Sequence, residues 1–315
     1  MRKIVFLCVT VAVLALSVSC AKQKMPTGWR YSDDVHVAID ETFRPIMEQE
    51  LESFGMQHIE AELCPVYCSE DSAIRMVLQD SIRSCVVTRE LSEAEKEYIK
   101  SQKLGVMWAR IATDALALIT NKENPDSLIT VEEIKGIVTG KITRWEQLKH
   151  SNKKGKISLV FDHSGSSTVR FMRDSICGGE ELKGNLYAQG TNKAVIEAVK
   201  NDPLVLGVVG ANWLKNPGQD VITDFSDLDV FVMKVSKDTD DEPVGFRPYQ
   251  YRIATGDYPL LRSVYAITTD PRRQSNVQLF YFFLKGQRGQ LIICKDSQML
   301  PIAPVQVKTV SFRES

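Results

Sequence analysis

Residues 35–55 read VHVAIDETFRPIMEQELESFG, and this stretch contains the pattern that decides the fold. Residues 35–39 alternate in polarity and are rich in β-favouring side chains, which predicts a strand. Apolar residues then recur at helical spacing until Gly55, and Pro45 falls in the first turn, where a missing N–H costs nothing. The stretch therefore predicts a strand, a polar turn at residues 40–42 and an amphipathic helix.

The same order of elements recurs immediately downstream. Residues 58–63 are predicted to form a strand, and Ser69 is placed to cap a helix. Residues 84–87 form a short predicted strand that ends in Thr88 and Arg89. This alternation of strands and helices indicates an α/β fold.

A long apolar stretch follows at residues 104–119. Arg110, Thr113 and Asp114 interrupt it, so that it is too long, and too polar at its middle, for one central strand. A chain of 315 residues usually forms two units, at roughly 100 to 200 residues per domain. We therefore interpret the stretch as a crossing between two lobes.

The second part of the chain again combines strands, polar loops and helices. Thr130 and Glu133 stand in capping-box register at the start of a predicted helix. Residues 157–161 predict a strand, and the loop 162–168, DHSGSST, leads into a helix that Gly178 ends. Further predicted elements are a helix at 193–199, a strand at 204–209 and helices at 277–284 and 290–294.

The composition is that of a folded globular protein. Hydrophobic residues make up 43% and charged residues 25%, which excludes a disordered polymer, a collagen and a polytopic membrane protein. Lys and Arg number 39 against 40 Asp and Glu, for a net charge of -1. Because phosphate backbones are bound by clustered basic residues, we expect no nucleic-acid partner.

The N-terminus has the features of a secretory signal. Arg2 and Lys3 precede the apolar run 4–16, which is too short for a good membrane span, and Cys20 follows it. This arrangement resembles a bacterial lipoprotein signal, in which Cys20 carries the lipid; an ordinary secreted protein with an incidental cysteine is the alternative. We expect a signal peptide at 1–19 and a lipidated tether at 20–32.

Two groups of residues could bind an anion. The hydroxyls and amides of loop 164–168 stand at a helix N-terminus, where unpaired amides and the helix dipole favour negative charge, and Thr42 offers the same geometry. Thr88 and Arg89 add a hydroxyl and a cation at the carboxyl end of a strand, where open α/β sheets place ligands. Simple capping by the hydroxyls and a surface salt bridge for Arg89 are the alternatives.

Asp114 and Arg170 are further candidates. A carboxylate such as Asp114 repels a fully ionised anion but accepts a hydrogen bond from a protonated one, so it would favour hydrogen phosphate over sulfate. A capping or solvent-facing role is the alternative for Asp114. Arg170 could reach the same ligand or pair with Asp174 at the i+4 spacing.

Enzymatic patterns are weak. His163 beside Ser164 raises the possibility of a serine hydrolase, but neighbouring turn residues rarely face each other and no Gly-x-Ser-x-Gly motif surrounds Ser164. The sequence has no Walker loop, dinucleotide fingerprint or His-Glu-x-x-His motif. We therefore expect no cofactor and no metal site.

Five ordered segments resemble the substrate-binding lipoproteins of phosphate ABC transporters, the PstS-like branch of the type II periplasmic-binding-protein superfamily. The resemblance spans about residues 35–305. The segments are VTRELS at 87–92, the stretch 117–148 with ITRW at 142–145, DHSGS at 162–166, the stretch 194–210 and the stretch 282–301.

The resemblance implies an α/β, two-lobed type II periplasmic-binding-protein fold with mixed sheets and a hinge between the lobes. It places lobe I at 33–118 and 250–315 and lobe II at 119–249. The implied ligand-binding residues are Thr42, Phe43, Thr88, Asp114, Ser164, Gly165 and Ser166. Val160 and His163 depart from the family pattern, which has Arg and Gly there, so Arg89 or Arg170 would have to supply the missing charge.

The implied function is capture of inorganic phosphate for an ABC permease, without covalent chemistry. The protein would act as a monomer, anchored by its lipid on the periplasmic side of a bacterial membrane. A receptor or sensor for another oxyanion or small acid keeps the same fold and stays open as an alternative, as does a secreted serine hydrolase.

Overall fold

A computed structural model describes residues 35–59, 61, 63–124, 126–215, 225–238, 240 and 242–303. The expected signal peptide at 1–19, Cys20 and the tether at 20–32 lie outside these residues.

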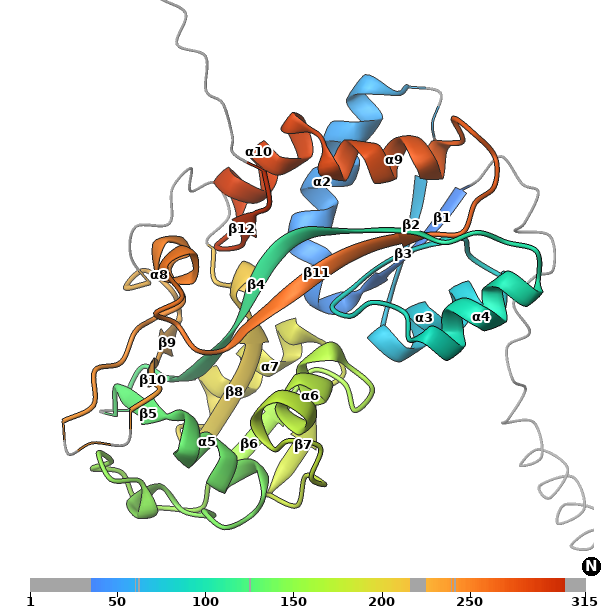
Figure 1. Cartoon of the computed structure of the whole chain (residues 1–315). Coiled ribbons are helices and arrows are strands. Elements are labelled where there is room, and N and C mark those ends of the chain that lie inside the picture. Colours follow the sequence, from blue (N-terminus) through green and yellow to red (C-terminus); the bar gives the residue numbers. More distant parts are fainter. Residues whose placement is uncertain are drawn as a thin grey trace, which may run out of the picture.

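Strands and helices alternate through most of the described chain (Figure 1). The strands are β1 (Val35–Asp40), β2 (Leu63–Cys68), β3 (Ser84–Val87), β4 (Met107–Asn121), β5 (Leu128–Thr130), β6 (Ser158–Phe161), β7 (Leu186–Ala188), β8 (Val205–Gly210), β9 (Val230–Val232), β10 (Lys234–Ser236), β11 (Leu261–Thr268) and β12 (Leu300–Pro301). The α-helices are α2 (Arg44–Gln57), α3 (Glu70–Leu78), α4 (Glu93–Ser101), α5 (Val131–Val138), α6 (Ser167–Phe171), α7 (Asn192–Asn201), α8 (Gln250–Thr255), α9 (Asn276–Lys285) and α10 (Gln287–Asp296). Three short 3-10 helices are η1 (Glu41–Phe43), η2 (Trp145–Gln147) and η4 (Ala211–Trp213), and η3 (Met172–Ile176) is a short π-helix.

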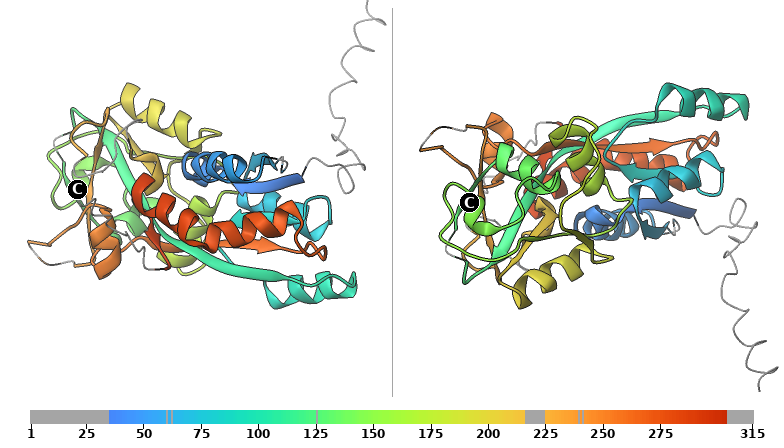
Figure 2. Two further views of the ribbon diagram at one scale, coloured as in Figure 1. Left: turned by 90° about the horizontal axis from the view of Figure 1, so that it is seen from above. Right: turned by 90° about the horizontal axis from the view of Figure 1, so that it is seen from below.

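The parallel strands β1, β2 and β3, with α2, α3, α4, α9 and α10, form what we call lobe I. Successive side chains of a strand point to opposite faces of a sheet. Val37 and Ile39 of β1 accordingly pack with the core residues of α2, α9 and α10, and Ala38 packs with those of α3 and α4. Seen from above, α2, α9 and α10 lie in front of the strands (Figure 2, left).

The second strand is displaced from its predicted position. The prediction of a strand at 58–63 is wrong: β2 begins at Leu63, and its residues pair with β1 from Val35 opposite Leu63 to Asp40 opposite Cys68. β2 is an edge strand of the sheet, and an edge tolerates Pro65, which cannot donate to a ladder hydrogen bond.

The stretch around Asp114 forms one strand of 15 residues, β4, so the prediction that it could not be a single strand is wrong. Its first part pairs with β11, and its residues from Leu116 on pair with β8. The predicted crossing is therefore present, as one strand that pairs with β11 over its first part and with β8 over its second part (Figure 1). Asp114 is tolerated at its middle because Arg262 stands directly opposite on β11.

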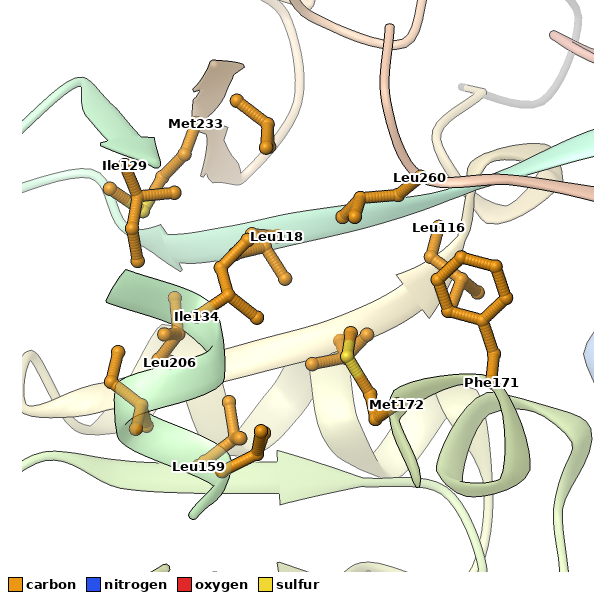
Figure 3. Packing of buried hydrophobic residues seen from close by; sticks show 14 of the residues in the cluster. Leu116, Leu118, Ile129, Ile134, Leu159, Phe171, Met172, Leu206, Met233 and Leu260 are labelled. Carbon is orange, nitrogen blue, oxygen red and sulfur yellow. The ribbon is translucent and has the colours of Figure 1, made fainter. Parts of the chain in front are cut away.

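The strands β6, β7 and β8, with α5, α6 and α7, form what we call lobe II, and β6 is parallel to both of its neighbours. The predicted elements at 157–161, 193–199 and 204–209 correspond to β6, α7 and β8. The Thr130–Glu133 capping box opens α5 as predicted. Figure 3 shows the packing of this lobe: Leu118 of β4 meets Ile134 of α5, and Leu159 of β6 and Leu206 of β8 lie beside them.

The C-terminal elements return to lobe I. β11 pairs antiparallel with β3 and β4. The predicted helix at 277–284 corresponds to α9, which buries Phe280, Tyr281 and Leu284 and is therefore part of the core. The mixed sheet and its covering helices confirm the predicted α/β fold. Within the described residues, no helix is both long and apolar enough to cross a membrane.

Candidate functional site

The loop after β6 lies at the junction of the two lobes. Ser166 caps α6 by accepting a hydrogen bond from the Val169 amide at 3.3 Å, and Ser164 is exposed at the loop surface. The Gly165 carbonyl accepts a 3.4 Å hydrogen bond from the Asp71 amide at the start of α3. The predicted polar loop of lobe II therefore faces a helix N-terminus of lobe I.

Thr42 lies at the same junction from the lobe I side. Its amide donates to Asp40 at 3.0 Å, and its hydroxyl donates to Asp162 of lobe II at 3.4 Å. Its carbonyl accepts from Asn212 at 3.0 Å and from Trp213 at 2.8 Å, so the turn after β1 is fixed against the end of β8. Thr42 and Asp162 are both buried.

Asp114 is committed to an ion pair that the sequence did not reveal. Arg262 Nη2 lies 2.8 Å from Asp114 Oδ2, and the two side chains are 4% and 0% exposed. Arg262 also donates to Ser167 at 2.9 Å and lies over the Phe43 ring at 5.3 Å. Burial raises the pKa of Asp114, and Arg262 opposes this effect. Asp114 is therefore neither a cap nor a solvent-facing residue.

Thr88 and Arg170 meet on a buried carboxylate. Glu70 Oε1 accepts from the amide and the hydroxyl of Thr88, both at 2.7 Å, and Arg170 Nε lies 2.5 Å from Glu70 Oε2. Arg170 also donates to the Thr88 hydroxyl at 2.7 Å and lies 3.8 Å from Asp174. Arg170 therefore keeps the predicted partner at the i+4 spacing and also reaches Glu70 and Thr88 at the junction.

Arg89 has a different partner. It forms two hydrogen bonds of 2.8 Å with Glu95, the residue that completes the capping box of α4 with Ser92. Arg89 nevertheless lines a pocket of about 400 Å³ between the lobes, together with Arg170 and Arg262. Guanidinium groups from both lobes therefore border this pocket.

Carboxylates outnumber guanidinium groups among the described residues of the junction. Burial, followed by the proximity of Glu70, raises the pKa of Asp40 to about 7. The buried acidic residues are Asp40, Glu70, Asp114 and Asp162, and the basic partners are Arg170 and Arg262. An added oxyanion is therefore accommodated more easily when it carries a proton that a carboxylate can accept.

The geometry for nucleophilic catalysis is absent from the described residues of the loop. His163 Nδ1 accepts a 3.1 Å hydrogen bond from the Gly165 amide, and no hydrogen bond joins His163 to Ser164. No cluster of His, Cys, Asp or Glu suited to a metal ion occurs in the part of the chain that the structure describes.

Sequence reasoning missed several residues of the junction. Glu70 had the appearance of an ordinary acidic residue in the first turn of a helix, and Asn192 that of a helix start. Asn192 donates to Glu41 at 2.7 Å and to Asp162 at 3.3 Å. Arg262 lies in β11, whose alternating sequence LRSVYAIT at 261–268 was the available signal for a strand.

Comparisons with known proteins agree on the fold. The profile of the PBP superfamily domain matches residues 27–284. The phosphate-binding protein PstS of Staphylococcus epidermidis is 22% identical over 252 residues, covering 79% of this chain and 73% of that protein. A crystal structure from Clostridium perfringens, described as a phosphate ABC transporter substrate-binding protein with bound phosphate, is 21% identical with a TM-score of 0.69 and covers 86% of this chain and 100% of that chain.

An ABC-type phosphate transport receptor from Vibrio cholerae is 18% identical with a TM-score of 0.58, covering 83% of this chain and 97% of that chain. The matched profile extends over most of the chain and includes the β1 turn, the shared strand β4 and the loop after β6. The chain therefore belongs to the PBP superfamily, as its resemblance to the type II periplasmic-binding proteins implied.

Proposed function

We propose that this protein is an extracytoplasmic solute-binding protein that captures inorganic phosphate between its lobes and delivers it to an ABC permease. The observation that carries the proposal is the set of donors around Glu70. The amide and hydroxyl of Thr88 in lobe I and the guanidinium of Arg170 in lobe II converge on one buried oxyanion, the Glu70 carboxylate. The names of the phosphate-binding relatives support the choice of phosphate.

In this proposal the ligand is held by groups from both lobes. The donors are the Thr42 and Phe43 turn, Thr88, Arg170 and the loop residues Ser164, Gly165 and Ser166. Asp114 Oδ1 has no hydrogen-bond partner among the described residues, so it can accept the proton of hydrogen phosphate. Arg89, held by Glu95, attracts the anion from the pocket wall without binding it directly.

The proposed location follows from the N-terminus. A diacylated Cys20 supplies the two acyl chains that stable membrane anchoring needs. The tether at 20–32 would then hold the domain on the periplasmic side of a bacterial membrane, where it works as a monomer beside the permease.

A receptor for a different oxyanion is the second candidate. Val160 is a buried core residue of β6. The phosphate-binding lipoproteins that the chain resembles have an arginine at this position. The guanidinium must therefore come from Arg170 or Arg262, and both are engaged by carboxylates. A site with this charge distribution favours a protonated oxyanion, and a panel of phosphate, sulfate, molybdate and organic acids identifies which.

Calorimetric titration of the purified protein with phosphate tests the proposal. We expect saturable binding that Arg170→Met weakens by roughly tenfold or more, because a charge-assisted hydrogen bond is lost. Arg173→Met is the matched control: Arg173 follows one helical turn later on the same segment and pairs with the partly exposed Asp174 at 2.7 Å. Absence of binding in the wild type, or equal loss in both variants, contradicts the proposal.

A further inference from the structure

The Glu70 carboxylate is an anion surrounded by the hydrogen-bond donors of Thr88 and Arg170, and we call this set of donors the cradle. Its Oε1 receives two hydrogen bonds of 2.7 Å from Thr88, and its Oε2 lies 2.5 Å from Arg170 Nε. Burial raises the pKa of Glu70, but Arg170 and the donors of Thr88 outweigh this effect and leave the pKa below its usual value. The carboxylate is therefore ionised at neutral pH and well solvated by protein groups.

The cradle is shared between the buried junction and the open pocket. Glu70 is 0% exposed, whereas the Arg170 side chain is 23% exposed. Arg170 and Thr88 both line the pocket of about 400 Å³. An anion that enters the pocket thus meets the guanidinium and hydroxyl groups that already hold Glu70.

Resting on the proposed function, we propose that Glu70 is a specificity-determining residue that competes with the ligand for Thr88 and Arg170. A ligand oxygen gains these donors only to the extent that Glu70 gives them up. Releasing a buried carboxylate from its partners is costly, so only a ligand with strong charge or several acceptor oxygens compensates for the loss. Glu70 thereby excludes singly charged small carboxylates in favour of an anion such as hydrogen phosphate.

The substitution Glu70→Gln tests this role. The amide keeps the shape and an acceptor oxygen for Thr88 but removes the charge that holds Arg170. We expect phosphate to bind roughly 10- to 100-fold more tightly, the value of one charge-assisted hydrogen bond, and acetate to bind measurably where the wild type ignores it. Titration calorimetry with phosphate and with acetate measures both, and thermal unfolding checks that the variant is folded.

Two further variants serve as controls. Asp174→Asn removes a carboxylate 3.8 Å from Arg170 that is 42% exposed and lies outside the cradle, and its affinity stays within roughly threefold of wild type because exposed pairs contribute little. Glu70→Asp keeps the charge, so its phosphate affinity lies closer to wild type than to Glu70→Gln.

The outcomes separate the inference from the function on which it rests. If the wild type binds phosphate and Glu70→Gln binds it equally or more weakly, Glu70 positions the donors and the competition is refuted, while the proposed function stands. If only Glu70→Gln binds phosphate, the competition is supported, but the proposed function of the wild-type protein fails. If neither protein binds phosphate, the proposed function fails and the competition fails with it.

Discussion

The buried pair of Asp114 and Arg262 lends itself to a quantitative test. The two side chains are 0% and 4% exposed and lie 2.8 Å apart, just before the point where β4 begins to pair with β8. Removing one partner leaves an uncompensated buried charge, which costs about 3–5 kcal/mol. Removing both charges in favour of apolar side chains of similar volume is far less costly, because neither ion then has to be desolvated. We therefore predict that Asp114→Leu and Arg262→Met are each strongly destabilising and that the double variant is close to wild type.

Urea-induced equilibrium unfolding of the wild type, the two single variants and the double variant measures the coupling. We expect a coupling free energy of at least ~2 kcal/mol between Asp114 and Arg262. Single losses below ~1 kcal/mol, or single effects that add within ~0.5 kcal/mol in the double variant, would refute the reasoning. A confirmed coupling also means that changes in anion selectivity of Asp114 variants have to be measured well below their unfolding temperatures.

Two further predictions concern other buried contacts. Burial, followed by the charge of Asp296, raises the pKa of Glu50 from 4.5 to about 9. As the pH rises between these two values, Glu50 is ionised in the unfolded chain but still protonated in the folded protein. The free energy of unfolding therefore falls by about 1.4 kcal/mol per pH unit in this range. Glu50→Gln removes this slope and stabilises the protein at pH 8; an unchanged pH profile of the unfolding free energy speaks against a protonated Glu50. In Gly210→Ala the new Cβ would lie 2.7 Å from Thr42 Cγ2, so the turn after β1 has to shift and phosphate binding weakens. In Gly55→Ala the new Cβ meets nothing within 4 Å, and the substitution stabilises α2 by about 0.5–1 kcal/mol. Equal effects of the two alanines on phosphate titration contradict this account of the β1 turn.

Local signals predicted the elements that depend on local physics. Hydroxyl caps and capping boxes, as at Thr130 and Glu133, predicted helix starts because their hydrogen bonds form within one turn. β2 was misplaced because its position is set by pairing with β1, and Pro65 argues against a strand until the strand is known to lie at an edge. β4 was not predicted as one strand because Asp114 is unsuited to a central strand unless Arg262 is known to stand opposite.

In the candidate site, too, residues with local signals could be predicted and residues that depend on distant partners could not. Ser166 and Thr88 stand at the ends of elements that the sequence shows, so they could be named in advance. Glu70 and Arg262 act through partners about 100 and 148 residues away in the chain, and no local pattern contains that information. Arg89 could be named as a candidate by its position at a strand end, but its hydrogen bonds to Glu95, six residues later, were not predicted.

The most direct test of the central claim is a calorimetric titration of the protein, stripped of bound ligand, with phosphate at pH 7 in the presence of excess sulfate. The account predicts saturable phosphate binding at one site that sulfate does not suppress, because the buried carboxylates of the junction accept a hydrogen bond from a protonated oxyanion and repel one without a proton. Loss of the phosphate signal under sulfate, or no phosphate signal at all, would contradict it.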